Sequence, residues 1–362
     1  MAYKANIKRK IKKFFFRTLD IIFPSGKNIN NILLLFVGNG YGDIFVSLHI
    51  PREIKKNAKS PKITMIASQK VINFFYPYGY IDKYEERNNL RNDILVNLSY
   101  KTVFFLIKKI LKIRPDLLIV WPEWCPASLI ALFKISGAKR IISFGDTELS
   151  SKTVIFKEER KEYIKKIANS IIKYAGNDSP DETVSFKLNH AQIQNADELL
   201  KTVNPDNLPI ILFNPESTNP ERTYSMNNVI ETVKLLLAKF PRHFILIPRY
   251  KEEKIYLSHK HIAMPEVKNI ELLIALMEKA DSVISVDTST VHIADILLKP
   301  LVALYSALYD SEGKILNPPK MTWRSPRSST VILYSDNIND ISPKIVAESM
   351  AESISRTKSA KN

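Results

Sequence analysis

Short apolar runs alternate with longer amphipathic stretches along most of the chain. Runs that are apolar throughout are typical of parallel strands buried on both faces, and the amphipathic stretches between them are typical of crossover helices. The pattern therefore predicts an α/β protein. The expected strands are residues 32–37, 63–67, 94–98, 116–120, 140–144, 210–213, 244–247, 282–286 and 301–305. The expected helices are residues 43–56, 100–113, 127–135, 158–174, 226–240, 270–279, 291–297 and 343–355.

A break divides these elements into two series, because turn-forming residues fill 176–181 and 204–206. A chain of 362 residues has room for two domains. We expect a basic amphipathic segment at 1–30, an N-terminal α/β domain at 31–177, a linker at 178–206, a C-terminal α/β domain at 207–340, and a final helix and tail at 341–362.

The basic excess is concentrated at the N-terminus. The chain has 53 Lys and Arg against 37 Asp and Glu, a net charge of +16, and residues 1–30 carry +7 of it. Apolar residues spaced by threes and fours from Ile7 to Ile22 predict a basic amphipathic helix. Arg17 and Asp20 interrupt its apolar run well short of the ~20 residues of a membrane span.

Two surfaces could cover the apolar face of such a helix. We expect residues 1–24 to lie on an anionic membrane surface. The alternative is a helix packed on the protein's own body with a solvated basic face. The chain shows no nucleic-acid-binding motif, so a nucleic-acid partner is not expected.

The chain has one cysteine, Cys125. A single thiol excludes an internal disulfide and a Cys-rich metal cluster, which favours a reducing, cytoplasmic compartment. The sequence also contains no Asp-x-Asp pair, so no metal ligand set is evident.

A glycine cluster separates the first expected strand from its helix. Gly38, Gly40 and Gly42 fall within five positions, although the chain has only nine glycines. Glycine is needed where the backbone takes a positive φ or where a ligand approaches it. A dinucleotide-binding fingerprint would need a glycine at position 43, where the chain has Asp43, so NAD or FAD is not expected. Asp43 is either a carboxylate beside a ligand cleft or a helix cap.

A second polar turn follows the expected strand 282–286. Asp287, Thr288 and Ser289 lead into a helix, and His292 lies one turn further on. Hydroxyls and free amides at a helix N-terminus suit a phosphate. His292 would donate to a phosphate oxygen, or it is a histidine packed under the sheet.

A third polar segment follows the expected strand 210–213. Ser217 and Thr218 supply hydroxyls and Arg222 supplies a guanidinium at the same carboxyl edge of the second expected sheet. Arg222 would neutralise a diphosphate, or it is a solvated surface arginine.

Taken together, residues 31–335 resemble glycosyltransferase family 9, the ADP-heptose:lipopolysaccharide heptosyltransferases. The most specific part is 280–294, which is similar to the family's Asp-Thr-Gly-x-x-His segment, with Ser289 in place of the glycine. Residues 300–305 are similar to the strand that follows, with Ser306 in place of its final glycine, and 114–140 are similar to an acceptor-domain segment. The resemblance implies the GT-B fold, in which a Rossmann-like acceptor domain and a Rossmann-like nucleotide-sugar domain face each other across a cleft.

The resemblance also implies residue roles. Asp43 takes the place of the family's general base, and Gly40, Tyr41 and Gly42 form the acceptor-side loop. The donor-site positions fall on Ser217, Thr218, Arg222, Glu252, Lys268, Asp287, Thr288, Ser289 and His292. Arg222 stands where the family has a lysine, and Lys268 falls where a residue near the adenine is usual.

The function implied is an inverting, metal-independent transfer of a heptose or related sugar from ADP-heptose to a lipopolysaccharide core acceptor. The expected partners are this nucleotide-sugar, the lipopolysaccharide core and the membrane surface, with no cofactor and no metal. The expected place is the cytoplasm, peripheral on the inner face of the bacterial inner membrane. Three alternatives stay open. The first is a GT-B transferase that uses a UDP-sugar or another nucleotide-sugar for a different surface glycan, and the second is a non-catalytic glycolipid-binding member. The third is a phosphate-binding α/β protein unrelated to sugars, which would not explain why both motifs fall at the carboxyl edges of two separate sheets. The lack of hydroxyls before Asp43 would fit the non-catalytic member.

Overall fold

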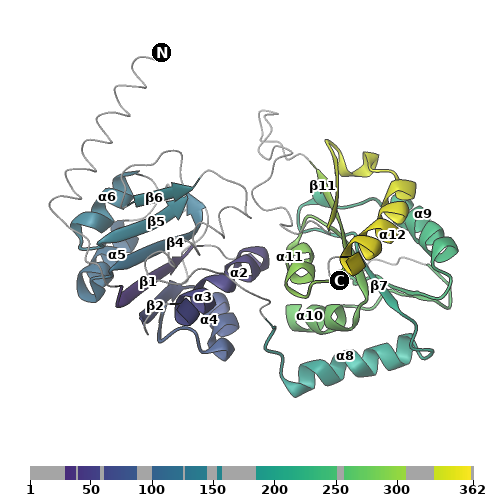
Figure 1. The fold of residues 1–362 in the computed structure, drawn as a ribbon, viewed down its shortest axis with the longest axis horizontal. Helices are drawn as coiled ribbons and strands as arrows, with labels where there is room; N and C mark the ends of the chain where they lie inside the picture. Colours follow the sequence, from purple (N-terminus) through teal and green to yellow (C-terminus); the bar gives the residue numbers. More distant parts are fainter. Residues whose placement is uncertain are drawn as a thin grey trace, which may run out of the picture. The chain divides into compact units, whose positions relative to one another are not determined.

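The computed structural model describes residues 29–37, 40–57, 61–87, 100–124, 127–144, 153–156, 185–250, 257–306 and 330–359. The chain divides into two compact units, Met1–Glu182 and Thr183–Asn362, and each unit is built on one parallel sheet (Figure 1). Within the described residues, no helix is long and apolar enough to span a membrane.

The first sheet lies under helices on both faces. Its strands are β1 (Asn31–Phe36), β2 (Lys62–Ala67), β3 (Lys83–Glu86), β4 (Leu117–Trp124), β5 (Arg140–Phe144) and β6 (Thr153–Phe156). They lie in the order β3-β2-β1-β4-β5-β6, with every pairing parallel. The helices are α2 (Tyr41–Ser47), α3 (His49–Asn57), α4 (Gln69–Phe75), the 3-10 helix η1 (Tyr76–Tyr78), α5 (Tyr100–Ile113) and α6 (Ala127–Ile135). Residues 32–36 of β1 are all buried, which explains why this strand is apolar throughout.

The second sheet repeats this plan. Its strands are β7 (Ile210–Asn214), β8 (Phe244–Leu246), β9 (Ile262–Ala263), β10 (Ser282–Val286), β11 (Leu301–Ser306) and β12 (Val331–Ser335). They lie in the order β12-β11-β10-β7-β8-β9, again all parallel. The helices are α8 (His190–Val203), η2 (Pro220–Arg222), α9 (Met226–Lys239), α10 (Ile270–Lys279), α11 (Ser289–Ile296), η3 (Ile338–Asp340) and α12 (Pro343–Ser359).

The core of each unit forms where helices cover a sheet face. In the first unit Leu106 of α5 and Phe133 of α6 pack on the same face of the sheet as Leu35 of β1. In the second unit Val233 of α9 and Met350 of α12 share one cluster with β7, β10 and β11. The final helix therefore packs on the second unit.

Both sheets have a strand order in which the first and fourth strands of the unit are neighbours. This is the Rossmann order, and ligands of such sheets bind outside the carboxyl ends of these two strands, where the chain reverses direction across the sheet. The position lies between β1 and β4 in the first unit and between β7 and β10 in the second. A site in either unit is therefore expected on the loops that follow these strands.

An aspartate joins the two central strands at their amino ends in each unit. Asp116, just before β4, accepts the backbone N–H of Asn31 at 3.0 Å and lies 2.6 Å from the Lys139 ammonium. Asp281, just before β10, accepts the N–H of Ile210 at 2.7 Å. Lys139 and the backbone donors outweigh partial burial and lower the pKa of Asp116. These bonds set which residues of the central strands lie side by side at the opposite, carboxyl end.

Several elements differ from the sequence expectation. The helix expected at 43–56 is two helices, α2 and α3, which meet at Leu48. A single helix would have placed Pro51 in its interior, where the missing N–H breaks a hydrogen bond, whereas in α3 it falls within the first turn. The short helix α4 was not expected, and residues 190–203 of the expected linker form α8, whose N-cap Asn189 makes a capping box with Gln192.

Four strands were also not expected: β3, β6, β9 and β12. All four are the outer strands of their sheets. Edge strands are covered less completely, so they need no continuous apolar run, and β3 reads Lys-Tyr-Glu-Glu. The strand expected at 94–98, the helix expected at 158–174 and residues 1–28 lie outside the described residues.

Candidate functional site

Asp43 lies just beyond the carboxyl end of β1, in the first turn of α2. Gly40 is the N-cap residue of that helix, and its backbone N–H donates to the Asp43 carboxylate. A Cβ added at Gly40 would lie 3.2 Å from Asp43 Oδ2, so glycine leaves room for this contact. The φ of Gly40 is −76°, so close approach and not a positive φ is the reason for glycine here. Asp43 therefore accepts the N–H of the N-cap residue from within the first turn of the helix, at the ligand-binding edge of the sheet.

Burial dominates the electrostatics of Asp43. Loss of solvent raises the pKa of this carboxyl from 3.8 to about 6, against the opposing effects of the Gly40 N–H and the Lys70 ammonium. The pKa of Lys70 is lowered by its own burial, and Asp43 partly opposes this shift. A carboxyl with a pKa near 6 is ionised at neutral pH and still basic enough to accept a proton.

Tyr41, two residues before Asp43 in α2, also contacts Lys70. The Lys70 Nζ lies 3.6 Å from the centre of the Tyr41 ring, a cation–π contact, and the same ring stacks on Phe45 at 6.0 Å. Gly42 also lies in α2. The predicted acceptor-side residues Gly40, Tyr41 and Gly42 are thus brought together with Asp43, while Gly38 lies outside the described residues.

The second unit brings Arg222 and Asp287 together at its own carboxyl edge. Arg222 ends η2, which follows β7, and Asp287 directly follows β10, the neighbouring strand. Arg222 Nη1 lies 3.1 Å from Asp287 Oδ2. Asp287 is buried and its pKa is raised by burial, while the Arg222 charge acts to lower it. Arg222 Nε is buried and makes no hydrogen bond in the part of the chain that the structure describes.

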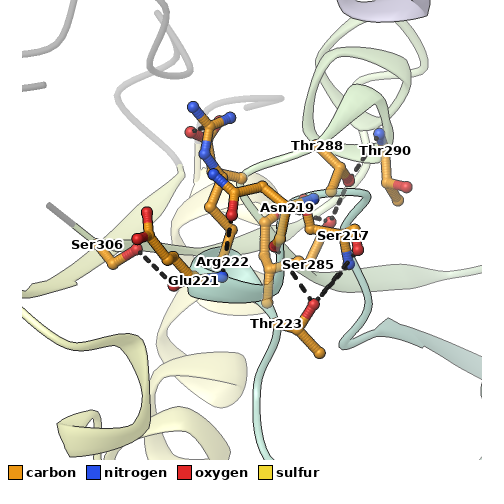
Figure 2. A network of polar contacts seen from close by, with 11 residues as sticks. Ser217, Asn219, Glu221, Arg222, Thr223, Ser285, Thr288, Thr290 and Ser306 are labelled. Atoms are coloured by element: carbon orange, nitrogen blue, oxygen red, sulfur yellow. Dashed lines mark hydrogen bonds and ion pairs between the residues drawn. The ribbon is translucent and has the colours of Figure 1, made fainter. Parts of the chain in front are cut away.

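A buried asparagine joins β7 to the start of α11. Asn214, the last residue of β7, donates from Nδ2 to Thr290 Oγ1 at 2.8 Å and to Thr288 Oγ1 at 3.2 Å. Thr288 is the N-cap of α11 and accepts the N–H of Thr290 (Figure 2). The Tyr250 hydroxyl forms a hydrogen bond with Thr290, and burial of that hydroxyl raises the pKa of Tyr250. This network holds the amide end of α11 at the sheet edge, where its dipole favours a bound anion.

The loop that carries Arg222 is held by a set of short polar contacts. Ser217 Oγ accepts the N–H of Asn219, and the Ser217 N–H donates to Thr223 Oγ1 at 3.1 Å. Ser306 Oγ, at the end of β11, donates to the backbone carbonyl of Glu221 at 3.2 Å. Figure 2 shows this contact beside Arg222, the next residue along the chain. The side chain of Ser306 therefore reaches the turn that carries the arginine.

The other predicted donor-site residues have no contact with the Arg222–Asp287 pair among the contacts described above. Thr218 is exposed on the same loop, and Ser289 is the first residue of α11. His292 is buried in α11, four residues after the N-cap. Lys268 is exposed after β9, two strands away from β7, and its Nζ lies 3.9 Å from the Glu266 carboxylate. Glu252 lies outside the described residues.

Three residues of the network were not among the predicted site residues: Asn214, Tyr250 and Thr290. Asn214 could have been predicted, because it is the polar residue at the end of the apolar strand β7. Thr290 could also have been predicted, because it follows the polar turn at 287–289. No sequence feature predicts Tyr250, because its contact with Thr290 joins segments forty residues apart. Within the described residues, no group of three or more His, Cys, Asp and Glu side chains is arranged to hold a metal ion.

The model of glycosyltransferase family 9 (heptosyltransferase) matches residues 106–330, which is more than half of the chain. The chain belongs to glycosyltransferase family 9. The protein is therefore a glycosyltransferase, and the resemblance seen in the sequence is confirmed. The matched span includes the donor-side residues Ser217 to His292 but begins after Asp43, so the catalytic role of Asp43 stays a prediction. No curated protein matches the sequence.

Solved structures agree with this family. A glycosyl transferase family 9 protein from Veillonella parvula DSM 2008 is 12% identical at a TM-score of 0.64, over 90% of this chain and 98% of that one. E. coli ADP-heptose lps heptosyltransferase II is 14% identical at a TM-score of 0.59, over 92% and 100%. E. coli heptosyltransferase WaaC with ADP is 11% identical at a TM-score of 0.59, over 89% and 99%. At these identities the likeness concerns the fold, and it confirms the expected α/β GT-B fold of this glycosyltransferase.

Proposed function

We propose that this glycosyltransferase moves a heptose or related sugar from ADP-heptose to a lipopolysaccharide core acceptor, by an inverting, metal-independent reaction. Membership in a family described as heptosyltransferase supports the sugar. One similar E. coli protein is an ADP-heptose lps heptosyltransferase and another is a heptosyltransferase with ADP, which supports an adenine nucleotide in the donor. The observation that carries the proposal is the Asp43 carboxyl, which is largely removed from solvent at the ligand-binding edge of the first sheet and has a pKa of about 6.

Asp43 suits the proton transfer that such a reaction needs. The acceptor hydroxyl oxygen attacks the anomeric carbon from the side opposite the diphosphate, and its proton passes to an Asp43 carboxylate oxygen. The bond from the anomeric carbon to the diphosphate oxygen breaks as the new bond forms, so the configuration inverts. General-base catalysis works best when the pKa of the base lies near the working pH.

The second unit suits the leaving group. The departing nucleoside diphosphate gains negative charge, and a fixed cation and oriented backbone amides stabilise such charge without reorganising. Arg222 supplies the cation, held by Asp287 at 3.1 Å, and the N-terminus of α11 supplies the amides. In this proposal these groups do what a divalent metal does in other transferases.

The acceptor would be presented at a membrane. We propose that the protein works in the cytoplasm, peripheral on the inner face of the bacterial inner membrane, with residues 1–24 as one contact because that segment is strongly basic and amphipathic. Deletion of residues 1–24 should lower the fraction that co-sediments with membranes. Unchanged co-sedimentation would mean that the segment does not contribute to the contact.

Nucleotide binding tests the donor directly. A ligand that binds the folded state at about 100 times its Kd stabilises it by about 2.7 kcal/mol, which a thermal shift detects. We expect ADP and ADP-heptose to raise the Tm more than UDP and UDP-sugars do, and Arg222→Ala and His292→Ala to reduce the shift. Arg242→Ala, an exposed arginine after α9, is the matched control.

Each other result has a defined meaning. A preference for UDP would replace the proposed donor by a UDP-sugar on a different glycan. No response to any nucleotide would contradict the donor site and favour a glycolipid-binding role.

A further inference from the structure

The outer side of α5 carries a stripe of exposed apolar side chains. Leu106 and Ile110 pack the inner side of this helix into the core of the first unit. On the outer side Tyr100, Phe104 and Leu111 are 77%, 69% and 53% exposed. They are spaced by four and seven residues, which places them along one line of the helix. Large apolar side chains exposed in a row are a mark of an interaction surface.

Three lysines run beside this stripe. Lys101, Lys108 and Lys112 are exposed and repeat nearly the same spacing, so they line one flank of the apolar residues. The helix contains no acidic residue. Lys109, by contrast, pairs inward with Glu85. Among the residues that the structure describes, no acidic side chain forms an ion pair with any of the three flanking lysines, and all three are exposed to solvent.

Charge decides which occupant fits this surface. The basic N-terminal segment of the same chain carries +7, and a second copy of α5 would bring the same lysines, so both would be repelled. An anionic surface is attracted instead. A helix with aromatic and leucine side chains on one line and lysines beside them is suited to lie in the plane of a bilayer interface.

We propose that the α5 face, defined by Tyr100, Phe104 and Leu111 with Lys101, Lys108 and Lys112, docks on an anionic lipid bilayer. The aromatic and leucine side chains enter the interface and the lysines contact the lipid phosphates. Leu132 and Ile135 of α6, which packs on the same face of the first sheet, are 38% and 51% exposed and lie on the helix beside it. This face is separate from residues 1–24, and a membrane partner for it rests on the proposed function.

A probe on α5 tests the contact in the full-length protein. Cys125→Ser removes the single cysteine, and Phe104→Cys then carries an environment-sensitive fluorophore. The control places the same fluorophore at Ile345→Cys on α12, a residue of similar type that is 48% exposed in the second unit. With vesicles of phosphatidylglycerol and phosphatidylcholine we expect a blue shift at position 104 that salt reverses, and none at position 345.

A charge series tests the lysines. Each basic residue near an anionic surface contributes about 1 kcal/mol, so Lys101→Gln, Lys108→Gln and Lys112→Gln together should lower the vesicle partition coefficient by at least about tenfold. The matched control replaces Lys201, Lys239 and Lys344, exposed lysines of the second unit, and should change it less than about twofold. Equal Tm values would show that both triple variants are folded.

Several results would overturn the docking proposal. One is the absence of a blue shift at position 104 while the protein sediments with vesicles. Another is binding to neutral phosphatidylcholine vesicles that equals binding to the anionic vesicles, and a third is no vesicle binding at all. A blue shift without vesicles that grows with protein concentration would assign the face to a second copy. An intact ADP thermal shift alongside any of these would leave the proposed sugar transfer standing, because that shift reads the second unit alone.

Discussion

Each unit has a group of candidate site residues at the carboxyl edge of its sheet, which we call its half-site: Asp43 in the first unit, and Arg222 with Asp287 in the second. The two half-sites occupy the same place in their sheets but differ in how their charges are stabilised. In the first unit one carboxyl, Asp43, is tuned mainly by burial. In the second unit Arg222 and Asp287 form an ion pair, and at the same sheet edge Asn214 and Thr288 form a hydrogen bond. A proton acceptor needs a raised pKa, which desolvation supplies. A site for a charged leaving group needs fixed donors, which a hydrogen-bonded network supplies.

The largest effect is expected from a substitution in the first half-site. Asp43→Asn removes the base but keeps the shape and the acceptor for the Gly40 N–H, so kcat should fall by about 10²- to 10⁴-fold. The ADP thermal shift should stay unchanged, because Arg222 is in the other unit. Glu86→Gln, an exposed acid of the first unit, is the control. Full turnover by the Asp43 variant with normal donor binding would refute the base.

The pH dependence should carry the signature of burial. Because the folded pKa of Asp43 is about 6 and its ordinary value is 3.8, kcat/KM should fall as the pH drops through about 6. For stability the sign is opposite: above pH 6 the buried charge destabilises the folded state, and this cost disappears as the pH falls toward 3.8. Asp43→Asn should therefore raise the free energy of unfolding at pH 7 by up to about 3 kcal/mol, at about 1.4 kcal/mol per pKa unit, and hardly at pH 4.

Comparison of urea unfolding for wild type and Asp43→Asn at the two pH values isolates this term, because other titrations cancel in the difference. An equal gain at both pH values would show that packing and not ionisation is the cause.

The next largest effect is expected from substitution of Arg222 in the second half-site. Arg222→Ala should weaken ADP binding by about 10- to 100-fold, since a hydrogen bond to a charged group contributes about 1.5–3 kcal/mol. Arg222→Lys should recover part of it, because the charge stays and the planar fork is lost. Isothermal titration with ADP measures both. Normal ADP affinity in Arg222→Ala would remove Arg222 from the donor site.

The smallest effect is expected from substitution of Ser306, whose hydroxyl contacts the turn that carries Arg222. Ser306→Gly removes the hydroxyl that donates to the Glu221 carbonyl, and a net loss of about 0.5–1.5 kcal/mol predicts ADP binding weaker by about 2- to 10-fold. Ser335→Gly on β12, the register partner of Ser306, is the matched control. The effect of Ser306→Gly should disappear in the Arg222→Ala background if Ser306 acts by positioning the arginine. An undiminished effect there would mean that Ser306 acts by another route.

The sequence predicted the central strands well and the outer ones poorly. β1, β7 and β10 are buried over nearly their whole length, so burial forces apolar runs that are visible without a structure. The outer strand β3 has no such run, because a sheet edge is covered less fully. The helix break before Pro51 followed from a known rule that helical periodicity alone does not express.

For the sites, the sequence by itself determined which polar residues follow the buried strands, and thus placed Asp43, Arg222 and Asp287 at the carboxyl ends of sheets. Tertiary structure alone decided that β7 lies beside β10, which brings Arg222 within 3.1 Å of Asp287, and that the Asp43 carboxyl loses most of its contact with solvent. Periodicity and turn chemistry are local, so they can be read along the chain. Strand order, burial and the pKa values that burial shifts depend on segments tens of residues apart, and these are set only when the sheets assemble.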